Sequence, residues 1–433
     1  MLKVIHLKSK YFPRHFRKII TRGDRELNNI EQTVRETLDD VRERGDKAVL
    51  ELTESYNGIH YDSVTDSKIP KEKIDESWGQ INPAFLEAFR AAKKKTFHFH
   101  EKQKSNSWFS AGEHGVILGQ RIRPIGRVGI YVPGGYSIFP AVTLLNVVPA
   151  QLAGVRDFYI VTPPDIFEEK PNPYLLAAAK EMHIPHIYRI GGAQAIGALA
   201  YGTESIPRVD KIIGQGNIYV SLAKRLVQDC VGIDMVQGPS EVVILADETA
   251  YPKVVALDLL SQAEKDEMSI SILITTSKEL AQYVVLEVEM LYKKISRHRI
   301  IKKSLEEFGI IFLVDTLEEG IDLVNDIAPE RLGLILKDAW QQLGIIKNAG
   351  AIFIGPYSPE SVGDYLAGPA QVLPTGGSAR FQSPLSVNDF LKTSNIIFYT
   401  EKALKEDYQY LHSFTSLEGF DVHSKAVQQR FSI

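Results

Sequence analysis

Short apolar runs alternate with longer amphipathic segments over most of this sequence, and this alternation constrains the fold more than any other feature. The apolar runs cover residues 158–161, 187–190, 211–213, 242–246, 270–275, 310–314, 332–336 and 351–354. Helical patterns separate most of them, at residues 174–182, 218–228, 278–292 and 317–327. Strands that alternate with helices are typical of parallel sheets covered by helices. We therefore predict an α/β protein built from two βαβ sets.

The segments that flank this alternating region have other patterns. Val34, Leu38 and Val41 recur at helical spacing, and a second helix is predicted over residues 83–104. The stretch 357–388 is rich in Gly, Pro and Ser and is longer than a structural connection needs, which favours a functional loop. A last strand is predicted at residues 395–399, followed by a polar tail of helical character.

Length and charge limit the classes of function. A chain of 433 residues is longer than one core usually supports, so two substantial bodies are expected. A net charge of -4 gives no electrostatic reason to expect binding to nucleic acid or membranes, and no segment is apolar enough to span a bilayer. The single cysteine, Cys230, excludes an intramolecular disulfide and suits a reducing compartment. We expect a cytoplasmic protein whose partner is a small molecule.

Glycines mark three predicted turns between strands and helices, at residues 133–135, 191–192 and 214–217. Glycine lets backbone amides approach a phosphate at a helix N-terminus, so these turns suit nucleotide binding. None of them is a G-x-G-x-x-G fingerprint, and the pattern alone favours ordinary tight turns over nucleotide binding. Nucleotide binding therefore stays one of two interpretations at this point.

Polar residues that could carry chemistry are scattered along the chain. They are Gln262, Glu264, Lys265, Glu330, Arg331, Asp364, Glu418 and His423. A basic residue beside an acidic one is usually a solvated pair, and a lone histidine in a tail is usually a surface residue. Spacing alone does not favour one functional cluster over these alternatives.

Eight segments, in order, resemble the signatures of the histidinol dehydrogenase family. They are residues 129–135 (GIYVPGG), 191–196 (GGAQAI), 209–212 (VDKI), 233–235 (IDM), 238–241 (GPSE), 258–264 (DLLSQAE), 328–330 (APE) and 372–375 (VLPT). The resemblance spans nearly the whole chain. It implies two successive NAD-dependent oxidations of an amino alcohol, a zinc ion that holds the substrate, and a homodimer.

The resemblance implies zinc ligands at Gln262, Asp364 and His423, but the family's remaining histidine ligand is Lys265 here. An ammonium has no lone pair to donate, so the sequence does not favour a family-type zinc site. If a metal binds, Gln262, Asp364 and His423 would be its ligands.

Two more family histidines are replaced. In the family's Glu-His acid/base pair the chain keeps Glu330 but has Arg331, which stays protonated and cannot relay a proton. The histidine that contacts substrate in the family is Gln371. The resemblance also implies that Ser240 and Glu418 bind substrate.

The nucleotide positions of the family are less altered. Tyr131, Gln194 and Asn217 stand where the family contacts NAD, although the family's Gly-Pro-Gly-Asn reads Gly-Gln-Gly-Asn at residues 214–217. NAD is therefore the expected cofactor.

These replacements lead to a hypothesis of a divergent enzyme: an NAD-dependent alcohol dehydrogenase, zinc-independent, that acts on an anionic alcohol other than histidinol. In it Glu330, Lys265 and Arg331 are catalytic, and Ser240, Gln262, Asp364, Gln371, Glu418 and His423 bind substrate. Two alternatives stay open: a genuine histidinol dehydrogenase with a rearranged site, and a catalytically silent paralogue that binds NAD or a small ligand.

The resemblance also implies an architecture. Two incomplete Rossmann-like domains are expected, the first from residues 24–128 plus 238–384 and the second from residues 129–237. An N-terminal arm, residues 1–23, and a C-terminal tail, residues 385–433, would reach the partner subunit of a homodimer. Glu418 and His423 would then complete the partner's site.

Overall fold

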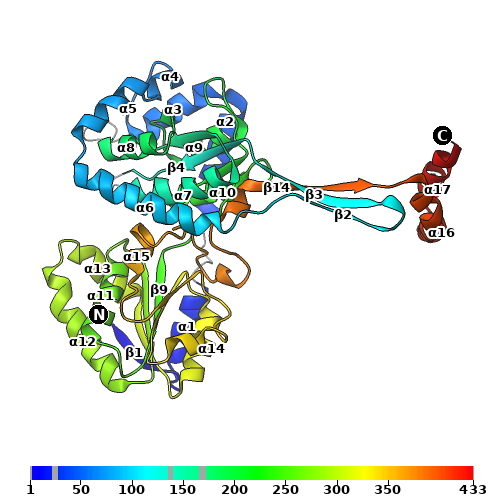
Figure 1. Cartoon of the computed structure of the whole chain (residues 1–433). Helices are drawn as coiled ribbons and strands as arrows, with labels where there is room; N and C mark the ends of the chain where they lie inside the picture. The colour runs from blue at the N-terminus through cyan, green and yellow to red at the C-terminus, as the bar shows by residue number, and fades with distance from the viewer. Residues whose placement is uncertain (1, 22–27, 135–139, 165–171, 433) are drawn as a thin grey trace.

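Two α/β bodies and one projecting arm make up the chain (Figure 1). The computed structural model describes residues 2–21, 28–134, 140–164 and 172–432. Gly135 of the first glycine turn and residues 22–23 of the expected N-terminal arm lie outside these ranges. Within the described residues, no helix is long and apolar enough to cross a membrane.

The first body contains a six-stranded parallel sheet of order β1-β11-β10-β9-β12-β13. The strands are β1 (Lys3–His6), β9 (Glu241–Ala246), β10 (Ile270–Thr275), β11 (Gly309–Leu313), β12 (Arg331–Ile335) and β13 (Ala351–Ile354). Both central strands β9 and β10 are buried along their whole length, as the continuous apolar runs predict.

Helices cover both faces of this first sheet. One face packs against α11 (Pro252–Ala263), α12 (Lys278–Leu291) and α13 (His298–Phe308). The other packs against α1 (Phe12–Ile20) and α14 (Leu317–Ile327). The N-terminal residues therefore join the first body as an edge strand and a helix, whereas the sequence interpretation made them an arm that reaches a partner.

The second body contains a five-stranded parallel sheet of order β6-β5-β4-β7-β8. The strands are β4 (Arg127–Tyr131), β5 (Asp157–Val161), β6 (His186–Tyr188), β7 (Lys211–Ile213) and β8 (Gly232–Ile233). The chain adds β5 and β6 on one side of β4 and then β7 and β8 on the other, so the strand order reverses between β4 and β7.

The helices of the second sheet come from two parts of the chain. One face carries α5 (Lys71–Ser77), α6 (Pro83–Glu101), α7 (Pro140–Ala153) and α8 (Pro173–Glu181). The other carries α2 (Asn28–Arg44), α3 (Asp46–Asn57), α9 (Gly192–Tyr201) and α10 (Ile218–Leu226). Residues 28–101 thus pack on the second sheet, and the grouping of residues 24–128 with 238–384 differs from this packing. An apolar face in the sequence of a helix indicates that this face is buried, but it does not indicate which sheet the face packs against.

The arm consists of a three-stranded antiparallel sheet that ends in two helices (Figure 1). Its strands are β2 (Trp108–Ala111), β3 (Ile117–Pro124) and β14 (Leu391–Phe398), and its helices are α16 (Glu401–Leu417) and α17 (Asp421–Gln428). The last predicted strand is therefore present, but it begins four residues earlier than expected because it pairs along all of β3.

Short elements complete the description. They are α4 (Val64–Ser67), α15 (Glu360–Tyr365) and the 3-10 turns Trp78–Gln80, Glu113–Gly115, Tyr292–Lys294, Ala339–Gln342, Ser378–Arg380, Val387–Phe390 and Gln429–Ser432. The predicted fold class, two parallel-sheet bodies with a C-terminal tail, is confirmed.

Candidate active site

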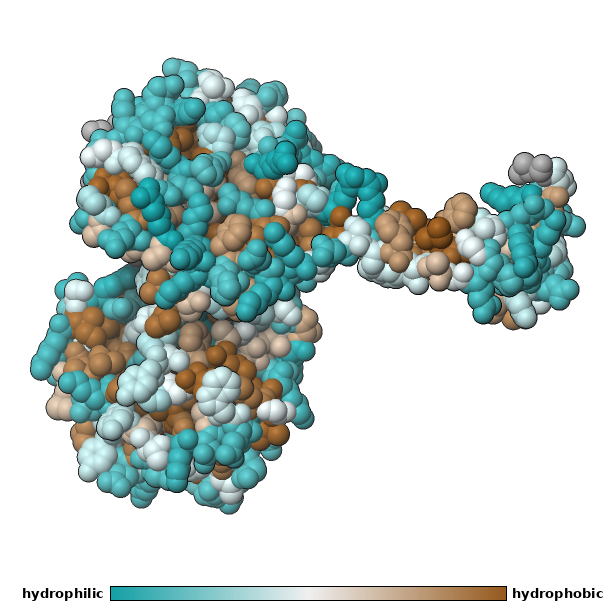
Figure 2. All heavy atoms as spheres, in the orientation of Figure 1, coloured by the Kyte–Doolittle hydropathy of each residue, from teal (hydrophilic) through white to brown (hydrophobic). Residues whose placement is uncertain are grey.

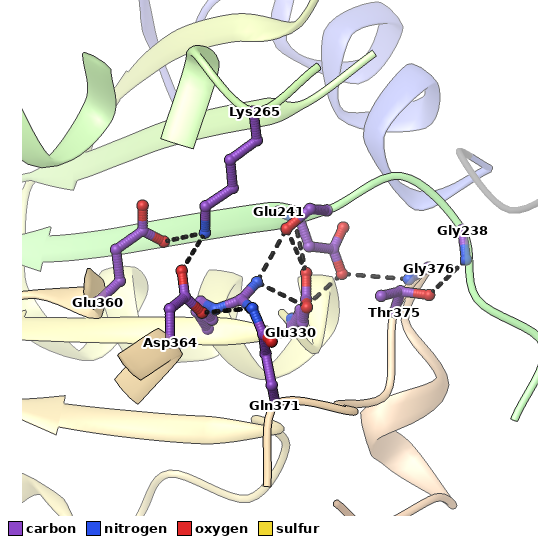
Figure 3. Close-up of polar contacts among 11 residues, drawn as sticks. Gly238, Glu241, Lys265, Glu330, Glu360, Asp364, Gln371, Thr375 and Gly376 are labelled. Carbon is purple, nitrogen blue, oxygen red and sulfur yellow. Dashed lines mark hydrogen bonds and ion pairs between the residues drawn. The ribbon is translucent and has the colours of Figure 1, made fainter. Parts of the chain in front are cut away.

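Charged side chains from three segments of the first body meet at the amino ends of β9 and β12 (Figure 3). Arg331 is the first residue of β12 and Glu330 directly precedes it, and Lys265 lies two residues beyond the end of α11. Glu360 and Asp364 come from the short helix α15. The local sequence explains the last pair, because residues four apart on a helix face the same side.

Asp364 bridges the two cations of this cluster. Its Oδ2 lies 2.8 Å from Lys265 Nζ, and its Oδ1 lies 3.0 Å from an Arg331 guanidinium nitrogen. Lys265 Nζ is also 3.5 Å from Glu360 Oε2, and Arg331 is 2.6 Å from Glu330 Oε1. The five side chains therefore form one continuous network of alternating charge.

Glu330 is held on its other side by hydrogen bonds. The Ser240 hydroxyl donates to Glu330 Oε2 at 3.0 Å, and the backbone N–H of Glu241 donates to the same oxygen at 2.8 Å. Arg331 in turn donates to the Ser240 hydroxyl oxygen at 2.8 Å. Ser240, Glu330 and Arg331 thus fix one another in a single geometry.

The network shifts the acidity of its members. Burial alone would raise the pKa of Asp364, but Arg331 and Lys265 together hold it below its ordinary value. Burial raises the pKa of the Glu360 carboxyl, and the attraction of Lys265 and Arg331 only partly offsets this. Burial would lower the pKa of Arg331, yet Glu330, Asp364 and Glu360 raise it, so Arg331 remains a fixed cation.

Two glutamines border the cluster. Gln371 donates a long hydrogen bond, 3.4 Å, to Asp364 Oδ1, and its own carbonyl oxygen has no partner. Gln262 is completely buried, and neither its amide nitrogen nor its amide oxygen has a hydrogen-bond partner. A buried unsatisfied amide costs about 1–3 kcal/mol, which is typical of a site that a ligand completes.

The remaining predicted substrate residues lie far from this cluster. Glu418 follows α16, and His423 lies on α17, both at the outer end of the arm (Figure 1). The chain therefore does not bring these two residues to its own cluster.

The predicted nucleotide residues gather in the second body, beside the carboxyl ends of its strands. Tyr131 ends β4, and its hydroxyl accepts a hydrogen bond from the Gly192 N–H at 3.2 Å. Burial raises the pKa of Tyr131 to about 12. Asn217 caps α10 by accepting from the Val220 N–H at 3.1 Å, and Gln194 donates to Asn57 at 3.3 Å. In open parallel sheets, ligands bind at such a point of strand-order reversal.

Sequence reasoning assigned no role to three acidic residues of the first body. Glu360 has a detectable signal, because it precedes Asp364 by one helical turn in a functional loop. Glu241 accepts from the Glu330 N–H at 3.2 Å and from the Gly376 N–H at 3.1 Å, a tertiary contact with no local pattern. Burial, and then the charge of Glu360, raise the pKa of Asp258 to about 7.

The histidinol dehydrogenase family model matches residues 20–431 of this chain. A histidinol dehydrogenase from Bacillus cereus is 48% identical over 402 residues, which cover 93% of this chain and 92% of that protein. A histidinol dehydrogenase from Caldanaerobacter subterraneus subsp. tengcongensis is also 48% identical and covers 96% of each chain.

The fold is similar to that of a solved relative. The crystal structure of histidinol dehydrogenase from Elizabethkingia anophelis superposes with a TM-score of 0.91 at 33% identity, over 100% of this chain and 98% of that one. The similarity therefore extends through both bodies and the arm.

These relatives correct one prediction. The hypothesis of a dehydrogenase for an alcohol other than histidinol is wrong, because proteins 48% identical over nearly their full length are histidinol dehydrogenases. The replaced histidines misled the interpretation, since three substitutions were given more weight than a match along the whole chain. The chain belongs to the histidinol dehydrogenase family.

Proposed function

We propose that this protein oxidises histidinol with NAD as the hydride acceptor. The observation that carries the proposal is the 48% identity to histidinol dehydrogenases over more than nine-tenths of the chain. The ordered Ser240–Glu330 contact supports it, because a fixed carboxylate is suited to accept a proton from a reacting group.

NAD is proposed to bind the second body near Tyr131, Gln194 and Asn217. The reversal of strand order between β4 and β7 supports this position. NAD held by these residues would supply the acceptor for the hydride of the carbinol carbon. The protein's part is then to orient the alcohol and to receive its proton.

We assign proton transfer to Glu330 and orientation to the two cations. Arg331 holds Glu330 at 2.6 Å and keeps its carboxylate in one position. The Lys265 ammonium is shielded by Asp364 and Glu360, so its proposed contact with a substrate oxygen needs a small movement of its side chain. Gln262 offers an unpaired amide oxygen and N–H groups to the polar end of the substrate, and Gln371 an unpaired amide oxygen.

The residues present do not fit the family's zinc ion. Within the described ranges, no group of three His, Cys, Asp or Glu side chains is placed to hold a metal. The Lys265 ammonium lies 2.8 Å from Asp364, where it competes for the oxygen that a metal would need. Within one chain, Gln262 and Asp364 alone supply too few donors for a tetrahedral site, so no step of this proposal passes through a metal.

A homodimer is proposed as the working form. Exposed apolar side chains lie along the arm, including Phe109, Ile397, Phe398 and Leu417 (Figure 2). Such side chains on a projecting arm are costly unless a partner covers them. In the dimer, Glu418 and His423 would reach the cluster of the other subunit.

The function is tested by following NADH absorbance with histidinol and NAD, comparing the parent protein with Glu330→Gln. Turnover should fall at least about a hundredfold in the variant, since a positioned acid/base group contributes roughly 10²–10⁴-fold. Glu318→Gln, an exposed change on α14, is the matched control and should keep parental turnover. NAD binding by the parent without turnover would instead favour a silent paralogue.

A further inference from the structure

A buried ion pair lies beneath the glycine turn that connects β7 to α10. Lys224, on α10, contacts Asp234, which follows β8, and the two side chains are only 2% and 0% exposed. This pair is separate from the charged network of the first body. The substrate chemistry described above does not use it.

The ion pair holds both backbone polar groups of Gly214, the first residue of the turn. Lys224 Nζ donates to the Gly214 carbonyl oxygen at 2.8 Å, and the Gly214 N–H donates to Asp234 Oδ2 at 2.9 Å. The other carboxylate oxygen accepts from the Met235 N–H at 2.7 Å. Each charged group thus has an additional hydrogen-bond partner, and the turn is fixed from both sides.

The backbone of Gly214 also has little room to move. Its φ is +109°, and a Cβ atom built on it would lie 2.1 Å from the Tyr131 carbonyl oxygen. The peptide of Gly214 therefore packs directly against the end of β4, across the point where the strand order reverses. A shift of this peptide would move Gly216 and Asn217 relative to Tyr131.

Stability alone is a weak explanation for the pair. Removing two charges from water is costly, and well-packed apolar residues often replace a buried ion pair without loss of stability. An apolar pair, however, could not hold a peptide by its N–H and its carbonyl at once. The hydrogen bonds to Gly214 therefore point to positioning.

We propose that Lys224 and Asp234 are positioning residues that hold the turn of residues 214–217 in its NAD-binding shape. This inference rests on the proposed function, because it requires NAD to bind at that turn. It assigns the pair no direct contact with NAD or histidinol.

The test is the NAD dissociation constant, measured by titration calorimetry on the full-length protein. Lys224→Met alone leaves a buried carboxylate unpaired and is expected to lower the melting temperature. The double variant Lys224→Met/Asp234→Asn removes both charges, so it serves as the folded probe. Lys303→Met, which breaks an exposed ion pair with Glu267 on the first body, is the matched control.

The double variant should bind NAD about tenfold or more weakly. Its KM for histidinol at saturating NAD should stay at the parental value, which a general loss of structure would not allow. Parental NAD affinity in a folded double variant would overturn the positioning role while leaving the proposed function intact. Absence of NAD binding in the parent protein would overturn the proposed function and this inference with it.

Discussion

Replacing Arg331 with Met should destabilise the first body by about 3–5 kcal/mol at neutral pH. Arg331 is only 3% exposed, and it is the direct partner of both Glu330 and Asp364. Its removal leaves Glu330 buried without its cation, while Asp364 keeps Lys265 at 2.8 Å. Methionine fills much of the same volume, so the loss would report the unpaired charge more than a cavity.

The assay is urea unfolding of the parent and the Arg331→Met variant, followed by far-UV circular dichroism. A second pair of proteins, Glu330→Gln and Glu330→Gln/Arg331→Met, completes a double-mutant cycle. The loss caused by Arg331→Met should be smaller when residue 330 is already neutral. A loss below about 1 kcal/mol in the parent background would refute the reasoning, because that is the value of an exposed pair.

Three further predictions concern single groups. The pKa of Asp258 is raised to about 7 in the folded state, so the folded protein binds the proton of the Asp258 carboxyl more tightly than the unfolded chain does. The stabilisation that this proton gives the folded state is therefore lost as pH rises from about 4 to about 7. Asp258→Asn should therefore melt higher than the parent at pH 8 and close to it at pH 4; equal differences at both pH values would contradict this. Lys265→His should retain more zinc after dialysis than the parent, because imidazole donates a lone pair beside Asp364 and Gln262; elemental analysis checks this, and equal zinc contents would show that Lys265 does not block the site. Tyr131→Phe should lower the free energy of unfolding by about 1 kcal/mol, since the Gly192 N–H loses its acceptor; no measurable loss would mean that water replaces the hydroxyl.

The local pattern of apolar residues predicted the strands and helices of the two bodies closely. The strand at residues 270–275 and the helix at residues 317–327 have the predicted bounds, because a buried strand and an amphipathic helix each have a short-range signature. Assignment of helices to sheets failed for residues 28–101. Their apolar faces are equally compatible with either sheet, and only the tertiary packing decides between them.

The candidate site, too, was predictable from the sequence only in part. The residues named from the family motifs, Lys265, Glu330, Arg331 and Asp364, meet in one cluster at the amino ends of β9 and β12. The contacts of Glu241 could not be predicted, since they join segments more than 80 residues apart. The position of Glu418 and His423 depends on how the arm projects, which no local pattern specifies.

The most direct test of the account is whether the purified protein converts histidinol at the expense of NAD. NADH absorbance and mass analysis of the product, measured on the same preparation with and without a chelator, report the reaction and its dependence on metal together. The account predicts NADH formation matched by loss of histidinol, unaffected by the chelator. NAD binding with no loss of histidinol would contradict it.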